Sequence, residues 1–236
     1  MNNKKILIEG SVIVVSILLA FGIDAMWDEY KERLGEQEIL AALKTEFEAS
    51  MNELNGVLEF HLNARDSMDE LFSSSDDEIR KLDQQKRSQF VMDMCNPWSF
   101  YPVIGTTNAL IGAGELDILE ERQLREALTA FLTLVEDSIE DIEYVGHDAE
   151  RVWVAEIDVG GPWTDRSTEI GLAGEVVKAP VFIPKPTTED VLRIRNDPKL
   201  KGLIARCHIN IGYYIVELER LKAGAQRVLD LIAESD

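Results

Sequence analysis

The feature that most constrains this chain is an apolar run near its N-terminus, Ile6–Met26, which follows two lysines. Its uninterrupted part, residues 10–23, is shorter than the roughly 20 residues that a helix needs to cross a hydrocarbon layer. The flanking residues, which include Glu9 and Asp24, supply the missing length. We therefore predict a transmembrane helix over residues 6–26, after a short N-terminal tail of residues 1–5.

Four side chains in or beside this run are candidate contact residues. Trp27 and Tyr30 follow it, where amphipathic rings anchor a helix at the lipid headgroups. Glu9 and Ser16 are two turns apart on roughly one face of the helix. Acidic side chains inside a membrane are rare and are usually paired, so Glu9 and Ser16 form a candidate intramembrane polar contact with a partner helix. The alternative is that Glu9 extends to the cytoplasmic headgroups.

A cleavable signal peptide is the competing interpretation of this segment. A short basic start, an apolar core and small residues near its end are typical of one. The run continues without a turn into a charged helical pattern, residues 27–48. This continuity favours an uncleaved signal anchor.

The orientation in the membrane depends on the basic residues at each end of the span. Lys4 and Lys5 lie within the five-residue tail, whereas Lys31 and Arg33 lie among several acidic residues. The positive-inside rule then favours a cytoplasmic N-terminus. We predict a single-pass protein of a bacterial inner membrane with its domain in the periplasm, and a cytoplasmic domain is the alternative.

The net charge of −20 restricts the partners of the chain. With 236 residues, the chain has room for one domain beyond the anchor, residues 27–236. An acidic surface argues against nucleic acid, whose phosphates require basic residues. We therefore predict the lipid bilayer as one partner, through residues 6–26, and another protein or a second copy of the chain as the other.

Three long segments carry one apolar stripe each, with steps of three and four residues that are typical of coiled-coil-like helices. They cover residues 40–71, 124–152 and 204–232. Shorter helices are predicted near residues 77–94 and after Thr187. Since such helices bury their stripes only against one another, we predict an all-α fold in which the transmembrane helix continues into an elongated antiparallel helical bundle.

Residues 158–186 interrupt this pattern with prolines and glycines. A segment of this length inside a helical domain is usually functional or mobile. Its short apolar runs indicate either an irregular loop or a small hairpin.

The two cysteines, Cys95 and Cys207, admit two interpretations. In an exported domain they could form a disulfide. Cys207, however, falls on the apolar stripe of residues 204–232, where a buried thiol behaves as a small hydrophobic residue. This position favours unpaired thiols, although the sequence leaves the pairing open.

Candidate catalytic chemistry is sparse. Glu140, Glu143 and His147 could build a carboxylate–histidine metal site, but their spacing differs from the Glu-x-x-His pattern of di-iron bundles and has no second copy. His61 falls on an apolar stripe, as a core histidine would. No nucleophile–base motif is visible, and we predict no catalytic residue, no cofactor and no metal.

Two stretches, residues 20–48 and residues 107–128, resemble sequences that occur together in one family. The first runs from AlaPheGlyIleAspAlaMetTrp into a charged helix, and the second contains ThrAsnAlaLeuIleGlyAlaGlyGluLeuAsp. The pairing resembles an uncharacterised bacterial family of small single-pass membrane-anchored helical proteins. Met26 stands where many relatives have a second tryptophan. The resemblance implies the anchor and the helical domain, and it implies no activity.

Three functions are compatible with this layout. The leading hypothesis is a non-enzymatic interaction, scaffold or accessory subunit of a bacterial envelope complex. The second is a ligand-sensing bundle that acts through a partner protein, and the third is an enzyme built on Glu140, Glu143 and His147. The sensing hypothesis needs a pocket formed by residues 158–186 and five aromatic side chains: Trp98, Phe100, Tyr101, Trp153 and Trp163.

Overall fold

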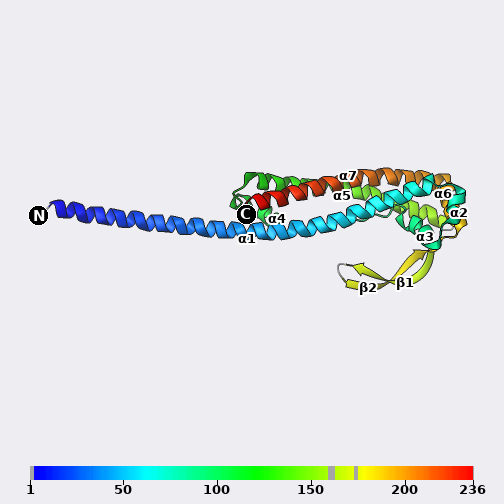
Figure 1. Ribbon diagram of the computed structural model, residues 1–236, viewed down its shortest axis with the longest axis horizontal. Coiled ribbons are helices and arrows are strands. Elements are labelled where there is room, and N and C mark those ends of the chain that lie inside the picture. The colour runs from blue at the N-terminus through cyan, green and yellow to red at the C-terminus, as the bar shows by residue number, and fades with distance from the viewer. Residues whose placement is uncertain (1–2, 159–162, 173–174, 236) are drawn as a thin grey trace. The chain divides into compact units, whose positions relative to one another are not determined.

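The computed structural model describes the backbone of residues 3–158, 163–172 and 175–235, and the side chains of residues 16–156 and 185–235. In these ranges the chain is predominantly helical, with seven α-helices, one short 3-10 helix and one β-hairpin (Figure 1). The elements are α1 (Asn3–Ser73), α2 (Asp76–Lys81), α3 (Gln84–Asp93), α4 (Gly105–Ala113), η1 (Leu116–Ile118), α5 (Arg122–Asp158), β1 (Trp163–Leu172), β2 (Glu175–Pro184), α6 (Thr188–Asn196) and α7 (Pro198–Ser235).

Helix α1 runs through the boundary between the expected anchor and the expected domain without a break. Among the side chains that the structure describes, no helix combines the length and the hydropathy that a membrane crossing requires. Residues 6–15 of the expected span, Glu9 among them, lie outside the described side chains.

The chain divides into two compact units. Unit 1 comprises residues 1–49, 103–129 and 227–236, and unit 2 comprises residues 50–102 and 130–226. Each contains segments of the three long helices.

Unit 2 is an antiparallel helical bundle. His61 of α1 stacks edge-on against Tyr214 of α7, and Asp69, two turns later in α1, contacts His208 at 2.9 Å, two turns earlier in α7. The predicted apolar stripes form its core, which confirms the bundle. Buried members are Leu54, Val57, Met68 and Leu71 from α1, Val145, Ala149 and Val152 from α5, and Ile204, Ile211, Leu218 and Leu221 from α7.

In unit 1 a carboxylate of α1 binds the start of α4. The buried Glu46 accepts hydrogen bonds from the backbone N–H groups of Thr106 and Thr107, which α4 itself cannot satisfy. Helix α4 ends where Gly114 adopts a left-handed conformation, with φ of 72°. The core consists of Leu40, Leu43, Phe47, Leu110, Leu119, Leu124, Leu128, Val228, Leu231 and Ile232.

The single helix predicted near residues 77–94 is in fact two helices, α2 and α3. Leu82 leaves the helical conformation, and the side chain of Asp83 accepts the backbone N–H of Lys86 at 2.8 Å. An aspartate can cap a new helix as well as continue an old one, and here the capping geometry prevails. The helix predicted after Thr187 is confirmed as α6, and the side chains of Ser75 and Thr187 cap α2 and α6 with capping boxes.

The segment near residues 158–186 contains the hairpin that was one of its two predicted forms. Strands β1 and β2 pair antiparallel, from Trp163 opposite Pro184 to Leu172 opposite Glu175. Each strand has a free edge, which is where proline is tolerated in a sheet.

Candidate functional site

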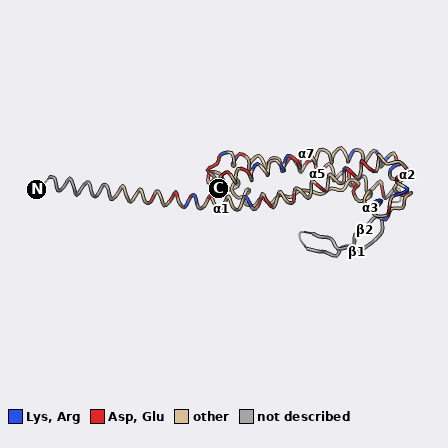
Figure 2. Tube along the Cα trace, in the orientation of Figure 1, with Lys and Arg blue, Asp and Glu red and all other residues tan. Residues whose placement is uncertain are grey.

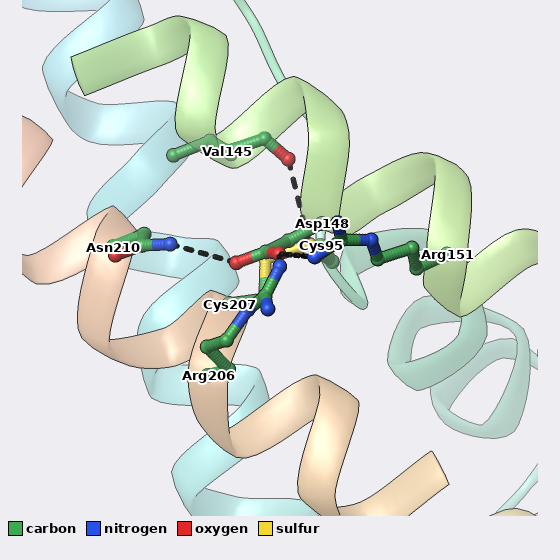
Figure 3. Close-up of a disulfide and its surroundings, with 7 residues drawn as sticks. All are labelled: Cys95, Val145, Asp148, Arg151, Arg206, Cys207 and Asn210. Carbon is green, nitrogen blue, oxygen red and sulfur yellow. Dashed lines mark hydrogen bonds and ion pairs between the residues drawn. A yellow bond between two sulfur atoms is a disulfide. The ribbon is translucent and has the colours of Figure 1, made fainter. Parts of the chain in front are cut away.

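Cys95 and Cys207 form a disulfide inside unit 2, with a Cα–Cα distance of 5.8 Å (Figure 3). Both half-cystines are fully buried. The preference for unpaired thiols was therefore wrong. A position on an apolar stripe does not distinguish the two states, because a half-cystine is as apolar as a thiol.

The disulfide ties an irregular turn to the central helix α7. Cys95 follows the end of α3 and has a φ of 53°, a left-handed conformation that residues other than glycine rarely adopt. Such a conformation costs on the order of 1–3 kcal/mol and persists only where its surroundings enforce it. The bond to Cys207 supplies that constraint, and it joins positions 112 residues apart in the sequence.

A buried carboxylate lies beside the disulfide. The side chain of Asp148 in α5 is only 1% exposed, and it forms an ion pair with Arg206 of α7. Its second oxygen accepts a hydrogen bond of 2.7 Å from the Asn210 amide, and the Arg151 guanidinium lies 3.7 Å away (Figure 3). Buried charges need partners of this kind, so Asp148 fixes the register between α5 and α7.

A second buried group holds the segment that crosses from α3 to α4. His61 is fully buried, and its Nε2 lies 2.9 Å from the carbonyl oxygen of Trp98. Because a carbonyl oxygen only accepts, Nε2 carries the proton. Tyr214 accepts the backbone N–H of Phe100 at 3.1 Å. The expectation of a core histidine is confirmed.

Burial sets the ionisation of both rings. It lowers the pKa of His61 below its ordinary 6.5, against the opposing effect of the hydrogen bond to Trp98. It raises the pKa of Tyr214 to about 12. Both side chains are therefore neutral at neutral pH, and neither is arranged to transfer a proton to a substrate.

Glu156 is the most unusual buried group in the described part of the chain. It lies near the end of α5, is fully buried, and receives no hydrogen bond on either carboxylate oxygen from any described residue. Desolvation raises its pKa to about 7. Among the side chains that the structure describes, no charged neighbour contributes to this shift.

Asp148 and Glu156 were not predicted to be buried structural groups, although the sequence carries a signal for them. Asp148 is three residues after Val145 and four before Val152, and Glu156 is four after Val152. These spacings place both acids on the buried face of α5. An acid on an apolar stripe should be treated as a candidate buried charge.

The predicted anchor residues lie on an exposed part of α1. Trp27 and Tyr30 are 55% and 54% exposed, and their ring centroids lie 5.8 Å apart. Ser16 lies on the same helix, whereas the side chain of its predicted companion Glu9 is outside the described residues.

The residues of the metal and sensing hypotheses are not gathered into a site. Glu140, Glu143 and His147 are exposed on α5, and the described side chains contain no group of three or more with metal-binding geometry. Of the five aromatic residues, Phe100 is buried, Trp98, Tyr101 and Trp153 are exposed, and Trp163 lies outside the described side chains.

Unit 1 contains an open acidic cleft of about 490 Å³ between α1 and the η1 turn. Its carboxylates come from Glu32, Glu36, Asp117 and Glu120. Glu36 accepts the backbone N–H of Glu120 at 2.6 Å and so holds the turn.

Removing the disulfide should destabilise the domain. For the Cys95→Ser/Cys207→Ser variant we expect the free energy of unfolding to fall by roughly 2–5 kcal/mol, because a long closed loop is released in the unfolded chain. Urea unfolding measures this loss, and reduction of the wild-type protein should reproduce it. An unchanged unfolding midpoint would contradict the structural role of the bond.

His61 should make the domain less stable in acid. In the folded protein the pKa of His61 lies below 6.5. The stability that neutral His61 contributes is therefore present above pH 6.5 and is lost as the pH falls through this lowered pKa. The His61→Gln variant can still donate to Trp98 but does not titrate. We expect the wild type to lose stability relative to this variant between pH 7.5 and pH 5, by about 1.4 kcal/mol per unit of pKa lowering. A pH-independent difference in thermal unfolding would show that His61 does not titrate abnormally.

Glu156 should make the domain less stable at alkaline pH. In the folded protein the pKa of the Glu156 carboxyl group is about 7, above the ordinary 4.5. The domain therefore loses stability as the pH rises through 7 and this carboxyl group loses its proton. We expect Glu156→Gln to match the wild type at pH 4 and to be more stable by on the order of 3 kcal/mol at pH 8. The exposed Glu150→Gln is the matched control and should change stability at neither pH. Equal stability of wild type and Glu156→Gln at pH 8 would count against a buried, unpaired carboxylate.

Comparison of the chain with models of known protein families, with curated proteins and with solved structures finds no match. The resemblance of residues 20–48 and 107–128 to a family of membrane-anchored proteins therefore stays a prediction.

Proposed function

We propose that this chain is a single-pass, membrane-anchored, non-enzymatic interaction subunit of a bacterial envelope complex, with its helical domain in the periplasm. The observation that carries the proposal is the exposed apolar part of α1. Leu18, Leu19, Phe21 and Ile23 are each more than 60% exposed. Contiguous apolar surface of this kind marks a contact with a membrane or another protein.

The charge and the aromatic residues of α1 favour lipid as the main contact of this surface. The apolar residues lie between the basic tail at Lys4 and Lys5 and the exposed pair Trp27 and Tyr30. That order is typical of an anchor with its basic end in the cytoplasm. Helix α1 continues from this apolar part into the helical domain without a break.

The disulfide supports the periplasmic side. Disulfides persist in oxidising compartments such as the bacterial periplasm and are rare in the cytosol. The Cys95–Cys207 bond in the core of unit 2 therefore agrees with the orientation that Lys4 and Lys5 favour.

The absence of a gathered catalytic group in the described residues favours interaction over catalysis. The buried side chains of Asp148, His61 and Tyr214 form hydrogen bonds with other parts of the domain and so serve its fold. Glu156 is enclosed and not open to a substrate. We expect the chain to co-purify in mild detergent with a membrane partner or with itself.

The anchor is tested by alkaline extraction of membranes from cells that express the full chain. The wild type should remain in the membrane pellet. Leu18→Asp/Leu19→Asp should move the protein to the supernatant, because each aspartate costs about 2.5–3.5 kcal/mol near the middle of a span. Leu18→Ala/Leu19→Ala is the matched control and should stay in the pellet. Recovery of the wild type in the supernatant, or of the aspartate variant in the pellet, would reject the anchor.

A further inference from the structure

The hairpin formed by β1 and β2 is a sheet whose pairing is incomplete. The two strands pair over their whole length (Figure 1), and in the described part of the chain no third strand joins them. A hairpin alone is only marginally stable in water, and it needs a further strand or a packed helix. The bundle supports the hairpin through β2, which contacts α3 and is followed by Pro186, whose carbonyl oxygen accepts hydrogen bonds of 3.1 Å from Gln84 and Arg87. No described helix packs along β1.

The outer edge of β2 is blocked by two prolines. Backbone N–H groups point alternately to the two sides of a strand, so the nitrogens of Pro180 and Pro184, four residues apart, lie on the same side. A proline nitrogen carries no hydrogen, and in a paired strand it is tolerated on the side that faces away from the partner strand. The outer edge of β2 therefore lacks the N–H groups of both prolines. Prolines at such positions protect an edge against further pairing.

The outer edge of β1 is open along the whole strand. Pro180 lies opposite Ser167, and Pro184 lies opposite Trp163. These are non-hydrogen-bonded pairs, in which the backbone groups of both members point outward. The outward-facing residues of β1 are therefore Trp163, Asp165, Ser167, Glu169 and Gly171, and none of them is proline. Each offers an N–H and a C=O group, at a repeat of about 6.8 Å along the edge.

From these two edges we infer that β1 binds β1 of a second copy of the chain, antiparallel, so that two hairpins form one sheet in the order β2–β1–β1–β2. A strand is the partner that fits, because another extended backbone offers complementary groups at the same repeat. A second copy supplies a strand with the same open edge, and a two-fold axis makes the contact self-complementary. The prolines of β2 then lie at both outer edges of the sheet, which stops its growth at two copies.

The charges of β1 select one alignment of the two copies. The alignments that pair most of the strand place the two-fold axis at Arg166, Ser167, Thr168 or Glu169. An axis at Arg166 or Glu169 sets that residue against its own mate, and an axis at Ser167 sets Asp165 against Glu169. Like charges directly opposite each other destabilise a sheet. An axis at Thr168 avoids all such pairs and sets Thr168 against its own mate, which is a favourable pair in sheets.

The neighbours of the charged residues are compatible with this alignment. Across the two-fold axis, Arg166 lies opposite Ile170, and Glu169 lies opposite Ser167. Within each hairpin, Lys178 of β2 lies opposite Glu169 and offsets its charge.

The net charge of the chain favours a contact made by the backbone. Acidic residues are distributed along the helices of the bundle together with fewer basic ones (Figure 2), and a net charge of −20 makes two copies repel each other. Hydrogen bonds between backbone groups do not depend on side-chain charge. A strand edge can therefore join two copies whose helical surfaces repel.

This inference names the partner of the interaction subunit proposed above, and it rests on that role. One pair of strands is smaller than a permanent interface. The dimer is therefore reversible in solution, and a membrane anchor favours it by raising the effective concentration of the copies.

A cysteine at the two-fold axis tests the alignment. Cys95 and Cys207 are bonded to each other, so Thr168→Cys supplies one free thiol. Residue 168 and its mate form a non-hydrogen-bonded pair with Cα atoms about 4.5 Å apart, a distance that a disulfide bridges. We expect mild oxidation of the full chain in membranes to give a covalent dimer. Thr164→Cys is the matched control and should stay monomeric, because its mate would lie about 27 Å away.

Proline substitution tests the open edge itself. In the Thr168→Cys background, Ser167→Pro removes an outward N–H group from β1 and should lower the yield of covalent dimer several-fold. Val176→Pro makes the same change at the outer edge of β2 and should leave the yield unchanged.

No dimer with Thr168→Cys, equal dimer with Thr164→Cys, or a yield that Ser167→Pro leaves unchanged would overturn the inference. A disulfide between Thr168→Cys and another protein, in place of the dimer, would show that the edge binds a different strand and would overturn it as well. Failure of the dimer is distinguishable from failure of the proposed anchor, because alkaline extraction tests the anchor without any contact between copies.

Discussion

The disulfide between Cys95 and Cys207 is the constraint on which unit 2 and its proposed location both depend. It fixes a left-handed turn after α3 to the buried face of α7, in the first third of that helix. Without that bond, the segment that crosses to α4 would be held by the contacts of His61 and Tyr214 with Trp98 and Phe100. Disulfides persist in oxidising compartments and are rare in the cytosol, which is the basis of the proposed periplasmic location.

Two buried acids of α5, Asp148 and Glu156, have different effects on the fold. Asp148 is satisfied by Arg206 and Asn210 and therefore specifies how α5 lies against α7. Glu156 lacks any described partner and lowers stability when it ionises. A domain that carries such a group is stable in spite of it, because the apolar stripes supply most of the favourable free energy.

Much of the fold could be predicted from the sequence because helical periodicity is a local signal. The stripes through Leu54, Val145 and Ile211 identified the core, and Thr187 identified the start of a helix. The predictions that were wrong depended on contacts between residues far apart in the sequence. Whether Cys207 pairs depends on where the turn at Cys95 lies.

The candidate sites were harder to predict than the fold for the same reason. Glu140, Glu143 and His147 share a helix region, but no other described element brings a further ligand to them. Asp148, in the same region, is buried because a partner helix covers it. Sequence spacing shows which face a residue occupies, and only packing shows what that face meets.

The redox state of the two cysteines in living cells tests the central claim most directly. Cells expressing the full chain would be quenched in acid, and free thiols would then be labelled under denaturing conditions with a maleimide polymer that retards the protein on a gel. The account predicts no retardation without reductant and a shift by two labels after reduction. Two labels on the unreduced protein would show that the bond is absent and would contradict both the constraint in unit 2 and the periplasmic location.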